Sequence, residues 1–478
     1  MITDSRRWQA LVLLCATFFM VVLDTAIVVV AMPSIEADLG FSTQDLQWVL
    51  SAYALSYGGL LLLGGRAADV LGRRRVFLLG LGLFTLASLV CGLSWSPATL
   101  IAARAVQGTG AALMTPAALS IITTTFPEGS ERNKALGAWT AMGAIGGAAG
   151  WLIGGPLTDG PGWEWIFYLN LPIGLAGLLL SSVLLRDSRG GTTRRFDLAG
   201  ALTATSSLVL LVYAIVTAPD AGWTSAQTVT TLAASAVLMA GFVVVESRVR
   251  QPLLPLRLLR SRTLSGANVS MVLFSATATG LPFVLTLYAQ QILGYSAVRF
   301  GVTAVVFPLG AVVGAAVGQR LVLRFGFRPV ATAGFILLGT SAFALSRVSV
   351  DGTYFGDIFW GLIALGPGVG LTFVTTSIAA LAGVGERDAG IASGLSNTTF
   401  QLGSAIGVAI VTTVAITRTD EVLGIGAAPA VALTEGFQAA FLTGTVLAAA
   451  GLLTALLTLR RTAGRLEPDR IPTPVAAE

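Results

Sequence analysis

The sequence contains no histidine, only two cysteines and a single lysine among 478 residues. Without histidine, the chain cannot form imidazole metal sites or histidine-based acid–base catalysis. Cys15 and Cys91 stand in separate apolar runs, so we interpret them as packing residues with no disulfide or metal role. A Gly-rich phosphate loop followed by Lys-Ser/Thr is also missing, which leaves ATP drive unsupported. We therefore predict no enzyme activity, no metal and no cofactor.

Charge is scarce as well. Only 11% of the residues are charged and 54% are hydrophobic, with a mean hydropathy of +0.81, whereas soluble domains carry about 25% charged residues. A bilayer accepts such a surface if the chain spans it as helices of about 20 residues. The isoelectric point of 9.6 does not indicate a nucleic-acid partner, because the basic residues fall in short segments between apolar runs. The sequence predicts an all-α integral membrane protein whose partner is the lipid bilayer.

The apolar runs predict fourteen transmembrane helices. The N-terminal run follows basic residues, as in a signal peptide, but it continues to about Ala31 without a convincing small-x-small cleavage site, so we expect a retained first span. The predicted spans lie near 8–32, 47–66, 76–94, 98–125, 134–157, 166–185, 198–217, 226–246, 263–290, 300–322, 329–347, 357–382, 391–416 and 435–459.

The basic residues fall almost entirely on one side of this topology. Segments on the side of the two termini contain 25 of the 29 Lys and Arg residues, the opposite loops contain Arg299, Arg347 and Arg418, and Arg104 lies within a span. The positive-inside rule then places both termini and the loops at 66–75, 186–197 and 248–262 in the cytoplasm. Abundant Ala and Gly with Arg in place of Lys suggest a GC-rich bacterial genome, so we expect a multi-pass protein of the bacterial cell membrane.

Two charged residues are predicted deep within spans, Asp24 in the first and Arg104 in the fourth. Such charges cost at least about 2.5–3.5 kcal/mol each and often serve function. The apolar neighbours of Asp24 disfavour its charged form, which suits reversible proton binding. Arg104 keeps its proton, so it can bind or tune a carboxylate but cannot carry a proton. The alternative for Asp24 is a structural carboxylate paired with a nearby arginine or with backbone donors, and the alternative for Arg104 is a static ion pair between helices.

The segment after the second span, GRAADVLGRRR, is partly repeated after the tenth span. We predict that it is a gating loop at the membrane edge, formed by Gly65, Asp69, Gly72, Arg73 and Arg74. A carboxylate there can meet a helix N-terminus or a basic residue of the other half. In the second copy Leu323 replaces the acidic residue, so the motif is complete only in the first half. The alternative is a basic loop that only sets orientation.

At this point the chain resembles the major facilitator superfamily. GRAADVLGRRR matches the superfamily's signature loop, and four other segments resemble motifs of its fourteen-span drug:proton antiporter branch, whose members export drugs, dyes and antibiotics. These segments are LDTAIVVVAMPSI (23–35), RAVQGTG (104–110), WEWIFYLNLPIG (163–174) and GLSNTTFQLGSAIGVAI (394–410).

The resemblance implies a major-facilitator-type fold with two six-helix bundles around a central cavity and two extra central spans. The expected divisions are a first bundle at 1–186, an inserted pair at 187–262, a second bundle at 263–460 and a cytoplasmic tail at 461–478. The chain departs from the branch at Val29 (usually Asn), Trp151 (usually Pro) and Glu164 (usually Arg). Trp151 belongs to the motif of the fifth span, with Gly150, Gly154 and Gly155, so antiport and symport both remain open.

The preferred hypothesis is export of small lipophilic drugs or antibiotics in exchange for protons, with Asp24 and Arg104 coupling the two. The alternatives are a carrier of the same fold for a dedicated metabolite, lipid or siderophore, and a receptor or membrane enzyme without transport. A monomer is the default expectation. The predicted cavity residues are Tyr53, Tyr57, Gln107, Asn268, Tyr288, Asn397 and Gln401.

Overall fold

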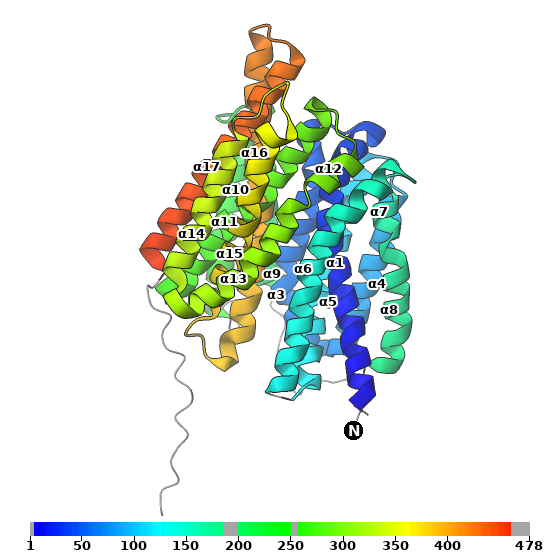
Figure 1. Ribbon diagram of the computed structural model, residues 1–478. Coiled ribbons are helices and arrows are strands. Elements are labelled where there is room, and N and C mark those ends of the chain that lie inside the picture. Colours follow the sequence, from blue (N-terminus) through cyan, green and yellow to red (C-terminus); the bar gives the residue numbers. More distant parts are fainter. Residues whose placement is uncertain (1–3, 128, 186–197, 250–256, 460–478) are drawn as a thin grey trace, which may run out of the picture.

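The computed structural model describes residues 4–127, 129–185, 198–249 and 257–459, and every regular element in these ranges is helical (Figure 1). We refer to α1–α8 as the first half. Its helices are α1 (Asp4–Leu39), α2 (Thr43–Leu46), α3 (Trp48–Leu71), α4 (Arg73–Gly92), α5 (Pro97–Thr125), α6 (Ser130–Asp159), α7 (Trp165–Tyr168) and α8 (Asn170–Leu184).

An inserted pair, α9 (Leu198–Ala221) and α10 (Ala226–Arg248), precedes the second half. The second half contains the 3-10 turn η1 (Leu258–Arg260), α11 (Arg262–Leu287), the π-helical turn η2 (Tyr288–Ile292), α12 (Ala297–Thr303), α13 (Val306–Phe325), α14 (Phe327–Leu345), the π-helical turn η3 (Tyr354–Ile358), α15 (Phe359–Leu381), α16 (Glu386–Gly424) and α17 (Pro429–Thr458).

These elements confirm the predicted all-helical membrane fold. In the described ranges, thirteen helical segments are long and apolar enough to cross a membrane, and the shorter apolar helix Leu202–Ala218 lies within α9. Two predicted loop residues lie in helices instead, Arg299 in α12 and Arg418 in α16. The helix α16 extends to Gly424 and, with α17, protrudes beyond the other helices (Figure 1). The predicted loop at 186–197 and tail at 461–478 lie outside the described residues.

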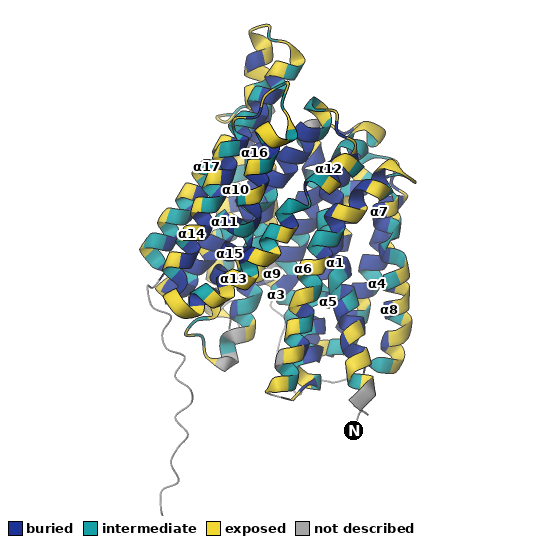
Figure 2. Ribbon diagram, viewed as in Figure 1, coloured by how far each residue is buried: buried dark blue, intermediate teal, exposed yellow. Residues whose placement is uncertain are grey.

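Many large apolar side chains lie on the outer surface. Val12 is 69% exposed, Leu179 73%, Val237 69% and Leu457 67%. Figure 2 shows exposed positions along the outer faces of helices whose inner faces are buried. Water would penalise this arrangement by about 25 cal/mol for each Å² of exposed apolar surface, whereas lipid does not. The outer faces are therefore those of helices in contact with acyl chains.

Close backbone approach holds neighbouring helices together. A Cβ atom on Gly64 of α3 would lie 2.1 Å from the carbonyl oxygen of Ala112 on α5, and one on Gly407 of α16 would lie 2.2 Å from the Cα of Ala276 on α11. Only glycine permits these contacts, which replace the hydrophobic effect as a source of cohesion between helices in lipid.

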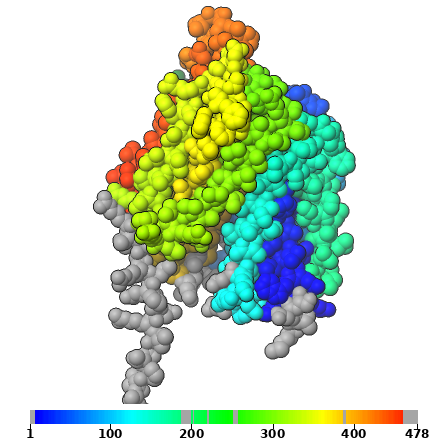
Figure 3. Space-filling view, in the orientation of Figure 1, coloured from blue at the N-terminus to red at the C-terminus, as the bar shows by residue number. Residues whose placement is uncertain are grey.

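The molecule has two distinct ends. We call the end where α1 begins and α17 ends the basic end, because Arg6, Arg73 and Arg324 lie there, and the other the opposite end (Figure 1). At the opposite end the halves are in contact: Gln291 donates to Glu36 (2.7 Å), and Asp159 accepts from the backbone N–H groups of Ala297 (3.2 Å) and Val298 (2.8 Å). At the basic end the surface is hollowed between α6 and α13 (Figure 3).

Candidate functional site

The centre of the first half contains a buried ion pair. Asp24 of α1 and Arg104 of α5 are both 0% exposed, and Arg104 Nη1 donates to Asp24 Oδ2 at 2.5 Å. The long apolar sequence of α1 makes it a membrane helix, and that helix carries Asp24 to mid-depth. The helix α5 begins with Ser96 as N-cap and Pro97 in the first turn, and it brings Arg104 to the same level. The two intramembrane charges predicted from the sequence are therefore direct partners.

The guanidinium group of Arg104 also contacts residues other than Asp24. Its Nε donates to the carbonyl oxygen of Val49 on α3 at 2.9 Å, and its Nη1 also donates to Gln107 Oε1 at 2.7 Å. Its central carbon lies 4.3 Å from the ring centroid of Tyr53, a cation–π distance. Arg104 thus links α1, α3 and α5.

The carboxylate of Asp24 also accepts two neutral donors. Gln107 Nε2 donates to Asp24 Oδ1 at 2.8 Å, and Asn170 Nδ2 of α8 donates to the same oxygen at 2.7 Å. Ser88 Oγ of α4 accepts from both amides, at 2.9 Å from Gln107 and 3.3 Å from Asn170. We call Asp24, Ser88, Arg104, Gln107 and Asn170 the charge network. All five side chains are 0% exposed and come from four helices.

The charge network surrounds the Asp24 carboxylate with hydrogen-bond donors. An ionised carboxylate only accepts hydrogen bonds, and Asp24 receives three donors, one of them cationic. Within the described part of the chain, Arg104 Nη2 and Asn170 Oδ1 find no hydrogen-bond partner, so the network is not fully satisfied. Removal of one partner of a buried ion pair typically costs about 3–5 kcal/mol, so loss of either charge is expected to destabilise this arrangement.

Sequence reasoning identified three members of the charge network and missed two. Asp24 and Arg104 stood out as charges in apolar runs, and Gln107 was assigned to the cavity. Ser88 was not singled out, because a serine within a span has no distinguishing signal. Asn170 had a usable signal, since it lies within the motif that resembles the family at the start of the sixth span.

The predicted gating loop joins α3 to α4 at the basic end. Gly72 has φ 101°, so it can end α3 and start α4 in a backbone conformation that other residues avoid. Asp69 lies in the last turn of α3, and Arg74 donates to the carbonyl oxygen of Ser182 on α8 at 3.1 Å. The gating role of this loop stays a prediction.

The predicted motif of the fifth span lies at the contact between the halves. Gly150 and Gly154 face α1, where added Cβ atoms would lie 2.6 Å from Ala26 and 3.0 Å from Ile27, and a Cβ on Gly155 would lie 2.6 Å from the backbone of Ala297 on α12. Trp151 is 5% exposed, and its ring centroid lies 5.7 Å from that of Phe300 and 5.5 Å from that of Phe307. Despite Pro156, α6 is one continuous helix.

The predicted cavity residues are dispersed. Tyr53 and Gln107 belong to the surroundings of Arg104, and the Tyr57 hydroxyl pairs with Thr115 at 3.2 Å. In the second half Asn268 accepts from Thr399 (3.0 Å), Tyr288 donates to the carbonyl oxygen of Ser349 (2.8 Å), Asn397 is exposed and Gln401 contacts Gly58. A cavity role for these residues stays a prediction.

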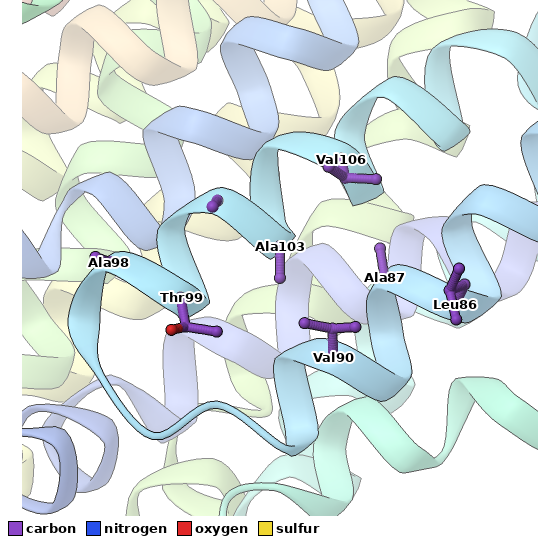
Figure 4. A pocket seen from close by; sticks show the side chains of 8 residues that line it. Leu86, Ala87, Val90, Ala98, Thr99, Ala103 and Val106 are labelled. Carbon is purple, nitrogen blue, oxygen red and sulfur yellow. The ribbon is translucent and has the colours of Figure 1, made fainter.

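A groove of about 530 Å³ lies on the outer face of α4 and α5 (Figure 4). Its walls include Leu86 and Val106, which are 60% and 46% exposed and so face the lipid. Thr99 supplies the only hydroxyl among the groove residues, and none of them is charged. The groove therefore offers nothing to orient a polar ligand, unlike the charge network.

Comparisons with known proteins give the family. The sequence model of the Major Facilitator Superfamily matches residues 14–408 of this chain. The cephamycin export protein CmcT of Amycolatopsis lactamdurans is 42% identical over 414 residues, which are 86% of this chain and 85% of that protein. The puromycin resistance protein pur8 of Streptomyces alboniger is 40% identical over 414 residues, which are 86% of this chain and 82% of that protein.

A solved structure shares the fold. The bacterial homologue of the human lysosomal transporter Spinster, in an inward-facing and unoccupied conformation, aligns with a TM-score of 0.66 at 17% identity and covers 95% of this chain and 97% of that chain. The match over most of the chain, the two relatives and the shared fold make this protein a membrane transporter rather than an enzyme. The chain belongs to the major facilitator superfamily.

Proposed function

We propose that this transporter exports small lipophilic drugs or antibiotics by alternating access, in exchange for protons. The observation that carries the proposal is the charge network, in which a carboxylate at membrane depth is held by donors from α5 and α8. The relatives CmcT and pur8, named for cephamycin export and puromycin resistance, support an antibiotic-like substrate.

In the proposed mechanism Asp24 binds the coupling proton. Protonation of Asp24 neutralises the carboxylate and removes its charge-assisted bond with Arg104, while Arg104 stays charged and keeps Val49 and Gln107 as acceptors. The contact of α1 with α5 and α8 then weakens. Loss of the proton restores it. The proton equilibrium thus biases how α1 packs, and α1 also contacts the second half through Glu36.

The orientation belongs to the same proposal. We assign the basic end to the cytoplasm, because 25 of the 29 basic residues fall in segments that the sequence predicts on the side of the two termini. The hollow between α6 and α13 then opens to the cytoplasm, and the contacts of Glu36 and Asp159 close the outer side. An ionised Asp24 suits this conformation, since a proton carried inward would already have been released. The first and second halves are the two bundles, which rock against each other during transport. A monomer in the inner membrane is sufficient for this mechanism.

Cysteine labelling in intact cells tests the orientation. A membrane-impermeant maleimide should fail to label single cysteines placed in the segments 66–75, 186–197 and 248–262. It should label a cysteine at Ile425, which is 84% exposed at the opposite end. External labelling of the three segments would reverse the topology.

Asp24→Asn tests the proton site. In proteoliposomes with an imposed proton gradient, uphill transport and substrate-evoked proton movement should both disappear, because an amide cannot cycle between a charged and a neutral form. Exchange of substrate at equilibrium should persist. Normal concentration of substrate by Asp24→Asn, with normal proton movement, would show that Asp24 does not carry the coupling proton.

Two controls address folding, since Asp24→Asn leaves Arg104 without its anionic partner. Asp24→Glu keeps the titratable group and should keep part of the coupled transport. A thermal unfolding curve in detergent should show a folded Asp24→Asn protein at the assay temperature. Loss of coupling in a folded Asp24→Asn variant then reports chemistry rather than misfolding.

A further inference from the structure

Two side-chain amides contact Asp24, and they differ in how many of their atoms have partners. Gln107 is engaged at both ends of its amide. Its Oε1 accepts from Arg104 Nη1 at 2.7 Å and from Cys91 Sγ at 3.7 Å, and its Nε2 donates to Asp24 Oδ1 at 2.8 Å and to Ser88 Oγ at 2.9 Å. Half a turn of this amide would point its NH2 group at the guanidinium group, donor against donor. Gln107 is therefore held in one orientation.

The amide of Asn170 is engaged at one end only. Its Nδ2 donates to Asp24 Oδ1 at 2.7 Å and to Ser88 Oγ at 3.3 Å. Its Oδ1 is buried and has no hydrogen-bond partner in the part of the chain that the structure describes. Buried polar side-chain atoms nearly always have a partner. An acceptor without one, on a residue that already contacts a buried carboxyl group, therefore needs a specific explanation.

The backbone that carries Asn170 is fixed against α4 on both sides of this residue. Before Asn170, the Tyr168 hydroxyl donates to the carbonyl oxygen of Gly92 at 2.7 Å. One turn after it, a Cβ on Gly174 would lie 2.1 Å from Thr85 Oγ1, so α8 and α4 are in close contact there. Rotation of the terminal amide of Asn170 is thus the change that requires no movement of α8.

The two protonation states of Asp24 require different partners. An ionised carboxylate only accepts hydrogen bonds, whereas a protonated carboxyl group also donates one and needs an acceptor. The nearby side-chain acceptors are mostly occupied: Gln107 Oε1 has two donors, and Ser88 Oγ accepts from both amides and donates its own proton to the carbonyl oxygen of Phe84 at 2.8 Å. Among the side chains of the charge network, Asn170 Oδ1 is the neutral acceptor that has no donor.

We propose that Asn170 is a positioning residue whose amide follows the protonation state of Asp24: it donates through Nδ2 to the ionised carboxylate and, after half a turn about χ2, accepts through Oδ1 from the protonated carboxyl group. The proton stays on Asp24 Oδ1, and no covalent bond of Asn170 forms or breaks. The proposal rests on the proposed proton site and adds the residue that supports its neutral form. Since a neutral hydrogen bond replaces a charge-assisted one, α1 stays attached to α8 more weakly while its contact with Arg104 loosens.

The other ionisable groups around Asp24 are few. From the surrounding helices it is faced by one charged side chain, Arg104 of α5, and by two neutral titratable ones, Tyr53 of α3 and Cys91 of α4. The helix α8 contains no titratable residue, and those of α6 and α11 lie near the helix ends. Because Arg104 keeps its charge, the hydrogen bonds of this site change with the proton concentration through Asp24.

Infrared difference spectroscopy of proteoliposomes tests the rotation in the parent chain. The sequence has only four asparagines, at 133, 170, 268 and 397, so selective 13C labelling of asparagine side chains isolates their amide carbonyl bands. On acidification the band that is absent from Asn170→Leu should move to lower frequency, because Oδ1 gains a donor. The bands of the other asparagines should not move. In Asp24→Asn the Asn170 band should no longer respond to acid, since the neighbouring group does not titrate.

The spectra separate failure of this proposal from failure of the proposed function. The carboxyl band of protonated Asp24, identified by its loss in Asp24→Asn, should appear in the same acid titration. If that band appears while the Asn170 band stays unchanged, the amide does not turn and the role of Asn170 is wrong. If no carboxyl band depends on Asp24, the proposed proton site is wrong, and the role of Asn170 is refuted with it.

Transport provides the second test. Asn170→Leu keeps the shape of the side chain without a donor or an acceptor, so the ratio of proton-driven uphill transport to equilibrium exchange of the lipophilic dye Hoechst 33342 should fall at least tenfold. Asn170→Gln keeps an amide and should recover at least threefold of that ratio. The matched control is Ser181→Ala, a buried change on the same helix that removes only a hydrogen bond to the carbonyl oxygen of Gly177; it should leave the ratio unchanged. A ratio within twofold of the parent in Asn170→Leu, or an equal fall in Ser181→Ala, would overturn the proposal.

Discussion

The two halves repeat one layout but differ in what they bury. Each has two consecutive membrane helices joined at a glycine of positive φ, Gly72 at 101° between α3 and α4 and Gly326 at 83° between α13 and α14. The first half buries Asp24 and Arg104, whereas the buried polar side chains of the second half, among its described residues, are all uncharged. The second half therefore has the same helical layout without a buried charge among its described residues.

The second half shows what a structural polar contact looks like in this molecule. Asn268 of α11 donates to the carbonyl oxygen of Leu264 at 2.9 Å and accepts from Thr399 of α16 at 3.0 Å. Neutral hydrogen bonds of this kind contribute about 0.5–1.5 kcal/mol each. Compared with these neutral hydrogen bonds, the ion pair in the first half has a larger desolvation cost and a larger penalty when one partner is lost. These properties suit a conformational switch better than a purely structural contact.

The largest expected effect comes from removal of the cation. Arg104→Met should lower the free energy of unfolding by about 3–5 kcal/mol, because Asp24 is left as a buried unpaired charge. Its counterpart Asn268→Leu should cost no more than about 1–2 kcal/mol, since Thr399 still donates to Ser396 at 2.9 Å. Denaturant unfolding in detergent micelles measures both.

The double variant Asp24→Leu with Arg104→Met sharpens the comparison. It removes both charges, so it should recover most of the stability lost in Arg104→Met while remaining unable to couple protons. A first half that tolerates Arg104→Met as well as the second half tolerates Asn268→Leu would remove the distinction between the halves.

Most of the fold could be predicted from the sequence because the bilayer imposes one simple requirement on each transmembrane helix. Each span needs a long apolar run, and all fourteen predicted spans match helical segments. The boundaries were less accurate where a helix leaves the membrane: nothing in hydropathy signals that α16 continues to Gly424, since its last turns are polar but still helical. Asp24 and Arg104 could be identified because charge is conspicuous in an apolar run.

The remaining site features depend on tertiary contacts. Ser88 and Asn170 are ordinary polar residues in sequence. Only the packing of α8 against α1 brings Asn170 to Asp24, and only the packing of α4 against α5 brings Ser88 to Gln107. Trp151 was visible only as a departure from the family motif, whereas the structure gives it partners on the other half. The position of α9 against α3 and α16 cannot be inferred from an apolar run, because such a run does not specify which neighbour it contacts.

A smaller and equal effect in both halves is expected at the glycine junctions. Gly72→Ala and Gly326→Ala should each lower the free energy of unfolding by about 1–2 kcal/mol, because a Cβ atom is disfavoured at positive φ. Thermal unfolding with matched controls at Gly82 and Gly241, where an added Cβ would meet nothing within 4 Å, measures the cost. A penalty in only one half would show that the junctions are not equivalent.

The smallest expected effect concerns the segments that join α3 to α4 and α13 to α14. In these segments Asp69 of the first half corresponds to Leu323 of the second. If Asp69 biases the access equilibrium through a helix N-terminus or a basic residue, Asp69→Asn should slow transport about tenfold, which corresponds to ~1.4 kcal/mol, and leave substrate affinity within twofold. The matched change Leu323→Asn, at a 70% exposed position, should alter neither quantity, because the second loop has no carboxylate to lose. Initial transport rates and equilibrium substrate binding on the same purified proteins separate the two effects. Unchanged transport by Asp69→Asn at normal expression would reduce the loop to an orientation signal, and the difference between the halves would then lie in the charge network alone.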